Sequence, residues 1–238
     1  MQPKITQKYS PNFNNFKRSK NSIKFLIIHY TGMKKENEAI NRLINIQSEV
    51  SSHYFIKYDG KILQLIPDKY VAWHAGKSNW HKKKLINNHS IGIEISNPGH
   101  NHGYKKYKKK QINALTSLLF YLKKNYKIST KNILGHSDIA PDRKKDPGEK
   151  FPWKLLANKK LCVWHHLNEN KIKIYRNTAI DNNQKRIFFK NLYKIGYSRI
   201  YKKKEDLVMA FQRKFRQNLI NGKIDKECFL ISKNLLNK

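Results

Sequence analysis

Two apolar segments of the chain predict central strands of a sheet. Residues 23–30 read IKFLIIHY, an almost continuous run of aliphatic and aromatic residues. A run of this kind, without polar alternation, is typical of a strand that is buried on both faces. Residues 90–96 read SIGIEIS, in which three isoleucines alternate with Gly92 and Glu94. Because neighbouring side chains of a strand point to opposite faces, this strand presents a lone carboxylate opposite the isoleucines.

Helical and hairpin patterns surround these strands. Residues 36–47 (ENEAINRLINIQ) and 112–126 carry apolar residues at the spacing of a helix face. Residues 51–68 (SSHYFIKYDGKILQLIPD) predict a hairpin in which Asp59-Gly60 is a two-residue turn. Strands mixed with helices in this way indicate an α/β fold, with a mixed central sheet flanked by helices.

The pattern also predicts how the chain is divided. The N-terminal residues are polar and predict an extended arm, and a second polar, irregular stretch predicts a linker. After that stretch, three short apolar faces at helical spacing predict a small three-helix domain. The predicted segments are 1–21 (arm), 22–161 (α/β domain), 162–183 (linker) and 184–238 (three-helix domain).

Charge is the most unusual property of the composition. The chain carries 50 Lys and Arg against 16 Asp and Glu, a formal net charge of +34. Such an excess attracts polyanions, and nucleic acid is one candidate. A binding face, however, concentrates its charge on one element, whereas lysine recurs in nearly every block of ten residues here. No nucleic-acid-binding motif accompanies the charge, so we expect no specific nucleic-acid partner.

Cysteine content and hydropathy narrow the class of protein further. Cys162 and Cys228 are too few for a disulfide framework and form no C-x-x-C pair. The N-terminus lacks the apolar run of a signal peptide, and no segment has the ~18 uninterrupted apolar residues of a membrane span. Taken as written, the chain is expected to be soluble and monomeric. Both the cytoplasm and the cell envelope stay open as compartments.

The densest group of ionisable residues lies in residues 135–148, GHSDIAPDRKKDPG. The segment KNILGH predicts a short strand that ends at His136, and a loop with two prolines could fold Asp146 onto the same point. With His29, at the end of the first apolar strand, the set has the composition of a catalytic zinc site. Imidazole and carboxylate together suit Zn²⁺ better than Mg²⁺ or Ca²⁺. Spacing alone leaves a purely structural role for these histidines open, since no H-E-x-x-H motif is present.

The order of the motifs adds a resemblance to a known family. FLIIHYTG, SSHYFIKYDGKILQLIPD, AWHAGKSNW, NNHSIGIEISNPG and GHSDIAPDRKKDPGEKFPW follow one another along the chain. This series resembles the zinc-dependent N-acetylmuramoyl-L-alanine amidases of the type 2 amidase family, most of all the AmiD branch. Residues 207–227 resemble the small peptidoglycan-binding domain that this branch carries at its C-terminus.

The resemblance implies a fold, a reaction and a set of site residues. It implies a peptidoglycan-recognition-type amidase fold with one Zn²⁺ per chain, which cleaves the amide between N-acetylmuramic acid, or its anhydro form, and L-alanine. The expected partners are peptidoglycan or muropeptides. The implied residues are the metal ligands His29, His136 and Asp146, the catalytic residues Glu94 and Lys144, and the substrate-cleft residues Trp73, His74, Ala75 and Arg143.

Two alternatives from other classes stay beside this hypothesis. A catalytically inactive peptidoglycan-binding protein on the same fold would have lost a ligand or the acid/base, whereas the three ligand positions and both catalytic positions, Glu94 and Lys144, are all filled here. A basic nucleic-acid-binding protein is suggested by the net charge alone. We also expect Trp80 and Trp153 to be core aromatics rather than substrate contacts.

Overall fold

A six-stranded mixed sheet forms the centre of the larger half of the molecule. The computed structural model describes residues 2–237. The strand order is β1-β5-β4-β9-β3-β10, and every pair is parallel except the β4–β5 hairpin. The strands are β1 (Ile5–Gln7), β3 (Phe25–Tyr30), β4 (Tyr54–Ile56), β5 (Ile62–Gln64), β9 (Ser90–Ile95) and β10 (Ile133–Gly135). The predicted mixed sheet is confirmed, with both predicted central strands at its centre.

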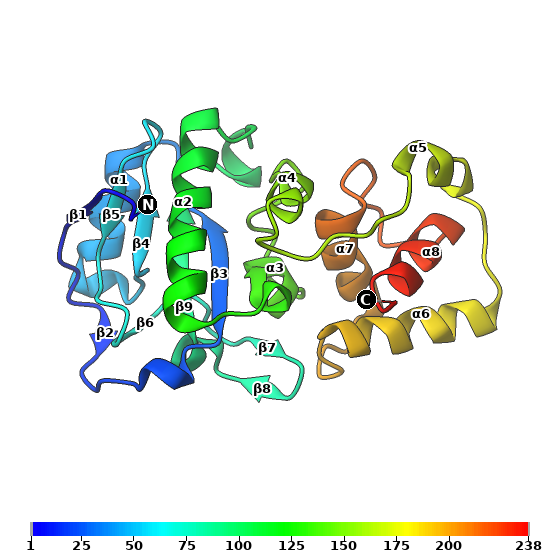
Figure 1. The fold of residues 1–238 in the computed structure, drawn as a ribbon, viewed down its shortest axis with the longest axis horizontal. Coiled ribbons are helices and arrows are strands. Elements are labelled where there is room, and N and C mark those ends of the chain that lie inside the picture. The colour runs from blue at the N-terminus through cyan, green and yellow to red at the C-terminus, as the bar shows by residue number, and fades with distance from the viewer. Residues whose placement is uncertain (1, 238) are drawn as a thin grey trace.

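Helices cover both faces of this sheet. Helix α2 (Lys109–Tyr126) buries an apolar stripe in the same core cluster as the three isoleucines of β9, and it crosses the front of the sheet in Figure 1. Helix α1 (Glu36–Ile44) packs with Phe55 and Leu63 in a second core cluster. Phe55 pairs in register with Glu94, so α1 lies on the side of the sheet to which Glu94 points. The expected layers of sheet and helix are therefore present.

Two predicted elements differ from the structure in length. The helix predicted over residues 36–47 ends at Ile44, because the Asn45 side chain accepts a hydrogen bond from the Gln47 backbone and starts a 3₁₀ turn, η2 (Ile46–Ser48). The hairpin loop has three residues, not two, since Lys57 pairs with Lys61. Gly60 adopts a φ of 88° in this loop, a conformation that glycine reaches without strain.

The N-terminal arm joins the fold. Strand β1 adds to the sheet as an edge strand on β5, and β2 (Phe13–Asn14) pairs with β6 (Val71–Ala72). Arg18 is buried and donates to the backbone carbonyls of Asp68 and Asn87. The segment is extended, as predicted, but it is packed onto the domain. A short ribbon of β7 (Asn79–Trp80) and β8 (Lys83–Lys84), also not predicted, extends toward the C-terminal half.

Three helices form the smaller half, as predicted: α6 (Asn182–Ile195), α7 (Lys204–Phe215) and α8 (Lys226–Asn234). We call them the C-terminal bundle. Helices α3 (His136–Ile139) and α4 (Trp153–Asn158) lie between the sheet and the bundle in Figure 1. Phe211 and Phe215 of the bundle belong to the same core cluster as Trp80 and Trp153, both of which are buried. The two halves therefore share one core.

The stretch predicted as a linker is folded rather than loose. It contains α5 (Glu169–Ile172) and the 3₁₀ turn η6 (Lys173–Tyr175), and it buries Trp164, Ile172 and Ile180.

Among the residues that the structure describes, no helix has the length and apolar character that a membrane crossing requires.

A buried ion pair joins the bundle to the loop that follows β10. Lys214 Nζ of α7 lies 2.7 Å from Asp138 Oδ2 of α3, and the two side chains are 6% and 1% exposed. The second carboxylate oxygen accepts a hydrogen bond from the Tyr197 hydroxyl at 2.8 Å. Asp138 Oδ2 also accepts from the backbone N–H of Gly135 at 2.8 Å. The bundle thus contacts the short helix that begins at His136.

Candidate metal centre

Three neighbouring strands end at one point of the sheet edge. In the parallel pair β3–β9, His29 lies in register with Glu94. In the pair β10–β3, Gly135 is the partner of Ile28, so the next residue, His136, lies beside His29. Parallel strands bring their carboxyl ends to the same edge, which explains why residues far apart in the sequence meet here.

The side chains of His29, His136 and Asp146 converge on this point. His29 Nδ1 lies 2.9 Å from His136 Nδ1 and 3.0 Å from Asp146 Oδ2, and His136 Nδ1 lies 3.1 Å from the same oxygen. All three residues are buried. They are the one group of three or more potential ligands found among the described residues. The sequence-predicted ligand set is thus brought together in space.

The loop after β10 delivers Asp146 by a short path. The Ser137 backbone N–H donates to the carbonyl of Asp146 at 2.9 Å, which closes the loop next to His136. Pro147 then packs against Gly135, where an added Cβ would lie 2.6 Å from the proline Cδ. Glycine at 135 is therefore needed for the strand end and the returning loop to approach this closely.

The donor set fits a zinc ion. His136 Nε2 lies 3.1 Å from the Ala75 carbonyl, and because a carbonyl only accepts, this nitrogen carries the proton. Nδ1 of His136 is therefore the nitrogen that faces the cluster. Burial lowers the pKa of His29 to about 4, so the His29 ring is neutral near pH 7. Two imidazoles and a carboxylate, beside an open cleft, are the donor set of a catalytic zinc site with its fourth position free.

Glu94 stands next to this centre with an unusual environment. Its Oε2 is buried and has no hydrogen-bond partner within the described part of the chain. Burial, together with the negative charge of Asp146, raises the pKa of Glu94 to about 8, and the Lys144 ammonium opposes this shift. A carboxyl group with a pKa near neutrality can both accept and donate a proton at physiological pH.

A cleft of about 680 Å³ opens over these groups. We call it the site cleft. It is lined by the three potential ligands and Glu94, by Arg42 and Leu43 of α1, and by four further predicted site residues, Trp73, His74, Arg143 and Lys144. Lys144 is half-buried there. The cleft therefore gathers all of the sequence-predicted site residues except one.

Ala75 is the exception. It is completely buried, and its carbonyl accepts hydrogen bonds from His136 and from the Arg143 guanidinium. Arg143 also donates to the carbonyl of Lys77, so its fork is held by two backbone groups. The Trp73 indole donates to Asn14 Oδ1 at 2.8 Å. The N-terminal segment thus fixes one wall of the cleft.

Sequence reasoning did not find three further residues that line the cleft, Tyr30, Arg42 and His100. The Tyr30 hydroxyl lies 2.8 Å from His100 Nδ1, and His100 Nε2 lies 3.1 Å from Glu149. Arg42 enters the cleft from α1. No motif or spacing points to these positions, because each comes from a different element. Only the position of Tyr30, directly after His29, is a signal that could have been used.

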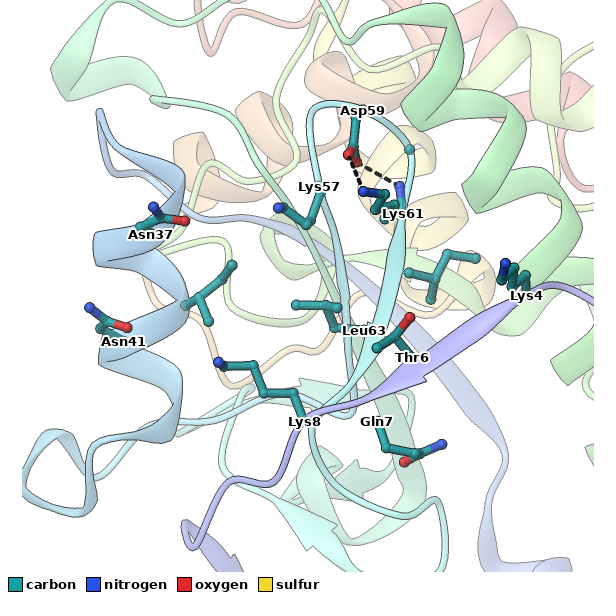
Figure 2. A pocket seen from close by; sticks show the side chains of 13 residues that line it. Lys4, Thr6, Gln7, Lys8, Asn37, Asn41, Lys57, Asp59, Lys61 and Leu63 are labelled. Carbon is teal, nitrogen blue, oxygen red and sulfur yellow. Dashed lines mark hydrogen bonds and ion pairs between the residues drawn. The ribbon is translucent and has the colours of Figure 1, made fainter.

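A second hollow of about 990 Å³ lies on the other side of α1 (Figure 2). It is bounded by α1 and the β1–β5 edge, and its charged side chains are Lys4, Lys8, Lys57, Asp59 and Lys61. Asp59 is already paired with Lys61, at 3.5 Å. This hollow is larger than the site cleft but contains no histidine, cysteine or unpaired carboxylate. Metal-dependent chemistry therefore belongs to the site cleft.

Comparisons with known proteins point to one family. A family model described as N-acetylmuramoyl-L-alanine amidase matches residues 19–149. The chain is 33% identical over 237 residues to N-acetylmuramoyl-L-alanine amidase AmiD of Escherichia coli K12, covering 91% of this chain and 83% of that protein. It is 41% identical over 104 residues to the 1,6-anhydro-N-acetylmuramyl-L-alanine amidase AmpD of the same organism, covering 44% of this chain and 55% of AmpD.

Solved structures extend the similarity to both halves of the molecule. E. coli AmiD in complex with anhydro-N-acetylmuramic acid-L-Ala-D-gamma-Glu-L-Lys matches with a TM-score of 0.78 and 32% identity, covering 91% of this chain and 89% of that one. AmpDh3 of Pseudomonas aeruginosa in complex with anhydromuramic pentapeptide matches with a TM-score of 0.79 and 28% identity, covering 94% and 93%.

Proposed function

The chain belongs to the N-acetylmuramoyl-L-alanine amidase family, and on that premise we propose that it is a zinc amidohydrolase acting on peptidoglycan fragments. The amide that it cleaves joins N-acetylmuramic acid, or its anhydro form, to the L-alanine of the stem peptide. One observation carries this proposal: His29, His136 and Asp146 converge at the sheet edge beside Glu94, whose Oε2 is buried and has no hydrogen-bond partner among the described residues.

The ligand roles follow from the donor atoms. Nδ1 of His29, Nδ1 of His136 and Oδ2 of Asp146 would hold the ion. A zinc ion bound there supplies a Lewis acid for the scissile carbonyl and for a water molecule. Neither Cys162 nor Cys228 contributes, since both cysteines are buried outside the cleft.

Glu94 moves the proton. Its carboxylate takes a proton from the attacking water as the new C–O bond forms at the amide carbon. The same carboxyl group then gives the proton to the nitrogen of L-alanine as the C–N bond breaks. A pKa raised by burial suits both steps, because neither protonation state is strongly favoured near neutral pH.

Lys144 would stabilise charge in the reaction, and the cleft walls would position the substrate. The Lys144 ammonium, close enough to influence the pKa of Glu94, would stabilise the negative charge that develops on the carbonyl oxygen. Trp73 and Arg143 would contact the sugar or the peptide. The C-terminal bundle would hold the polymer and raise the local substrate concentration at the cleft. The anhydro-muramyl peptides bound in the AmiD and AmpDh3 structures support this class of ligand.

Metal analysis and turnover test the proposal together. We expect about one zinc per chain and release of the stem peptide from an anhydro-muropeptide, with activity lost to a chelator and restored by zinc. Glu94→Ala should keep its zinc and lose turnover. Glu38→Gln, at an exposed carboxylate of α1, is the matched control and should keep both. Near-normal turnover in Glu94→Ala, or a folded wild-type protein without zinc, would contradict the proposal.

A further inference from the structure

A chain of hydrogen bonds leads from the metal centre into the core behind it. His29 Nε2 lies 3.0 Å from His74 Nδ1, and His74 Nε2 lies 3.0 Å from Ser90 Oγ. The Ser90 hydroxyl donates to the carbonyl of Ile86 at 2.7 Å. The chain therefore begins at a backbone carbonyl and ends at a potential metal ligand.

The direction of every hydrogen bond in this chain follows from its first member. The Ile86 carbonyl can only accept, so the single hydroxyl proton of Ser90 is committed to it. Ser90 Oγ must then accept from His74 Nε2–H. A neutral imidazole has one N–H, which leaves His74 Nδ1 as the acceptor for His29 Nε2–H. Nδ1 of His29 consequently faces His136 and Asp146 without a proton, as a metal ligand requires.

We infer that His74, supported by Ser90, is a positioning residue that fixes the tautomer and the ring orientation of His29 for metal binding. This inference rests on the proposed zinc function. Metal-ligating histidines generally donate their second nitrogen to a carboxylate, a carbonyl or water. Here a second imidazole takes that place, and its own tautomer is set from the backbone.

The surroundings hold the His74 ring in place. The ring packs over Gly92 of β9, where an added Cβ would lie 2.4 Å from His74 Cγ. The planes of His29 and His74 are inclined at 81°, with ring centroids 5.1 Å apart. The His53 ring also lies beside His74, with 5.7 Å between the ring centroids. Only glycine at position 92 leaves room for the imidazole.

Two consecutive residues thus serve both histidine ligands. The side chain of His74 accepts from His29, and the carbonyl of Ala75 accepts from His136. The backbone N–H groups of both residues donate to Asn87 Oδ1, at 3.2 and 2.7 Å, which anchors the segment. Since both nitrogens of His74 are engaged, neither is left to donate to a substrate or accept from one. His74 and Ala75, two of the residues predicted to contact substrate, therefore support the metal centre.

Zinc affinity is the measurement that separates this role from a substrate contact. In competition with a chromogenic chelator, His74→Phe should bind zinc about 10- to 100-fold more weakly than the wild type. His74→Asn can place an oxygen near the position of Nδ1 and should restore part of the affinity. Ser90→Ala, two hydrogen bonds from the metal, should lose roughly two- to tenfold, the effect of one hydrogen bond.

A matched control and a spectroscopic readout complete the test. His165→Phe removes another buried imidazole, one that does not line the site cleft, and should leave zinc affinity unchanged. Ring ¹⁵N shifts of the metal-free wild type should show His29 protonated at Nε2, and His74→Phe should yield a mixture of tautomers. Wild-type affinity in a folded His74→Phe, or His29 protonated at Nδ1, would overturn the inference. A wild type that shows the expected tautomer but binds no zinc would instead contradict the proposed function.

Discussion

At the scale of single residues, Glu94 is the residue whose surroundings most change its chemistry, because they raise the pKa of its carboxyl group. Its carboxyl group sits at the end of β9, beside the charge of Asp146 and with one oxygen unpartnered. Placing a carboxyl group in such a site costs free energy whenever it ionises. Because the pKa of Glu94 lies near neutrality, the stability of the folded state should depend on pH in this range.

Replacing Glu94 should change the pH dependence of folding in the metal-free protein. The pKa is about 8 in the folded chain against an ordinary 4.5, so between these values the folded state keeps a proton that the unfolded state releases. The protonated Glu94 carboxyl group therefore makes its full contribution to the free energy of unfolding below about pH 4.5, and this contribution is lost as the pH rises toward 8. Glu94→Gln does not titrate, so its stability relative to the wild type should increase across this window.

Urea unfolding in the presence of a chelator, at several pH values, measures this difference. His29 and Asp146 titrate in both proteins, so their contributions largely cancel in the comparison. A difference between variant and wild type that stays constant from pH 5 to pH 8 would show that Glu94 keeps an ordinary pKa.

Lys144 is the second residue whose role can be tested alone. Lys144→Met should lower kcat by about 10²- to 10³-fold, the effect of removing one group that stabilises an oxyanion. Zinc content should not change, because the ammonium is not a ligand. Lys109→Met, at an exposed lysine at the start of α2, provides the matched control. Loss of zinc in Lys144→Met would indicate instead a structural role in the loop.

At the scale of elements, the main feature is the junction between the C-terminal bundle and residues 136–151, the segment that carries His136 and Asp146. Helix α7 supplies Lys214 to Asp138, and Gln217, which follows the helix, donates to the carbonyl of Phe151 at 2.7 Å. The Tyr201 hydroxyl donates to the carbonyl of Ile139. Each contact falls on the segment that begins at His136. The bundle therefore stabilises the loop that carries two of the three potential ligands.

Breaking the ion pair at this junction should destabilise the whole molecule. Lys214→Met leaves the Asp138 carboxylate buried without its cation, and removal of one partner of a buried pair typically costs about 3–5 kcal/mol. The double variant Lys214→Met/Asp138→Asn should recover part of this loss. Lys233→Met, at an exposed lysine of α8, is the control. Urea melts give the free energies, and a single variant within about 0.5 kcal/mol of the wild type would contradict this account.

At the scale of the whole molecule, the charge of +34 is the property that the proposed reaction does not require. Exposed lysines are spread along the chain, including the ends of α2, the β7–β8 ribbon and the residues between α6 and α7. A surface of this kind attracts polyanions without reading their structure. Carboxylates of the stem peptide are compatible with it, but they do not explain its size.

Binding to DNA should therefore be weak and without sequence preference. We expect any affinity for duplex DNA to fall by about 10³-fold or more between about 50 and 200 mM salt. Fluorescence anisotropy with two unrelated duplexes of equal length measures both properties. An affinity that differs between the two duplexes and persists at the higher salt concentration would contradict this expectation and support the nucleic-acid-binding alternative.

Local periodicity explains which parts of the fold could be predicted. The uniform apolar run of β3 is typical of a strand buried on both faces, and the alternation of β9 reports the two-residue repeat of a strand, so both strands could be located from the sequence. Glu94 was expected opposite the isoleucines for the same reason, and it does point to the other face. Where a local contact competed with the repeat, as at Asn45, the predicted helix was too long.

The sequence by itself thus determined the α/β class, the main elements and, through its ordered motifs, the set of residues from which the site is built. The structure alone decided that His29 and His136, 107 positions apart, share one point in space. It also decided that the N-terminal arm supplies an edge strand to the sheet and that His74 lies behind a ligand. Spacing along the chain reports geometry within an element, whereas these contacts depend on strand order and register, which arise only when the whole sheet forms.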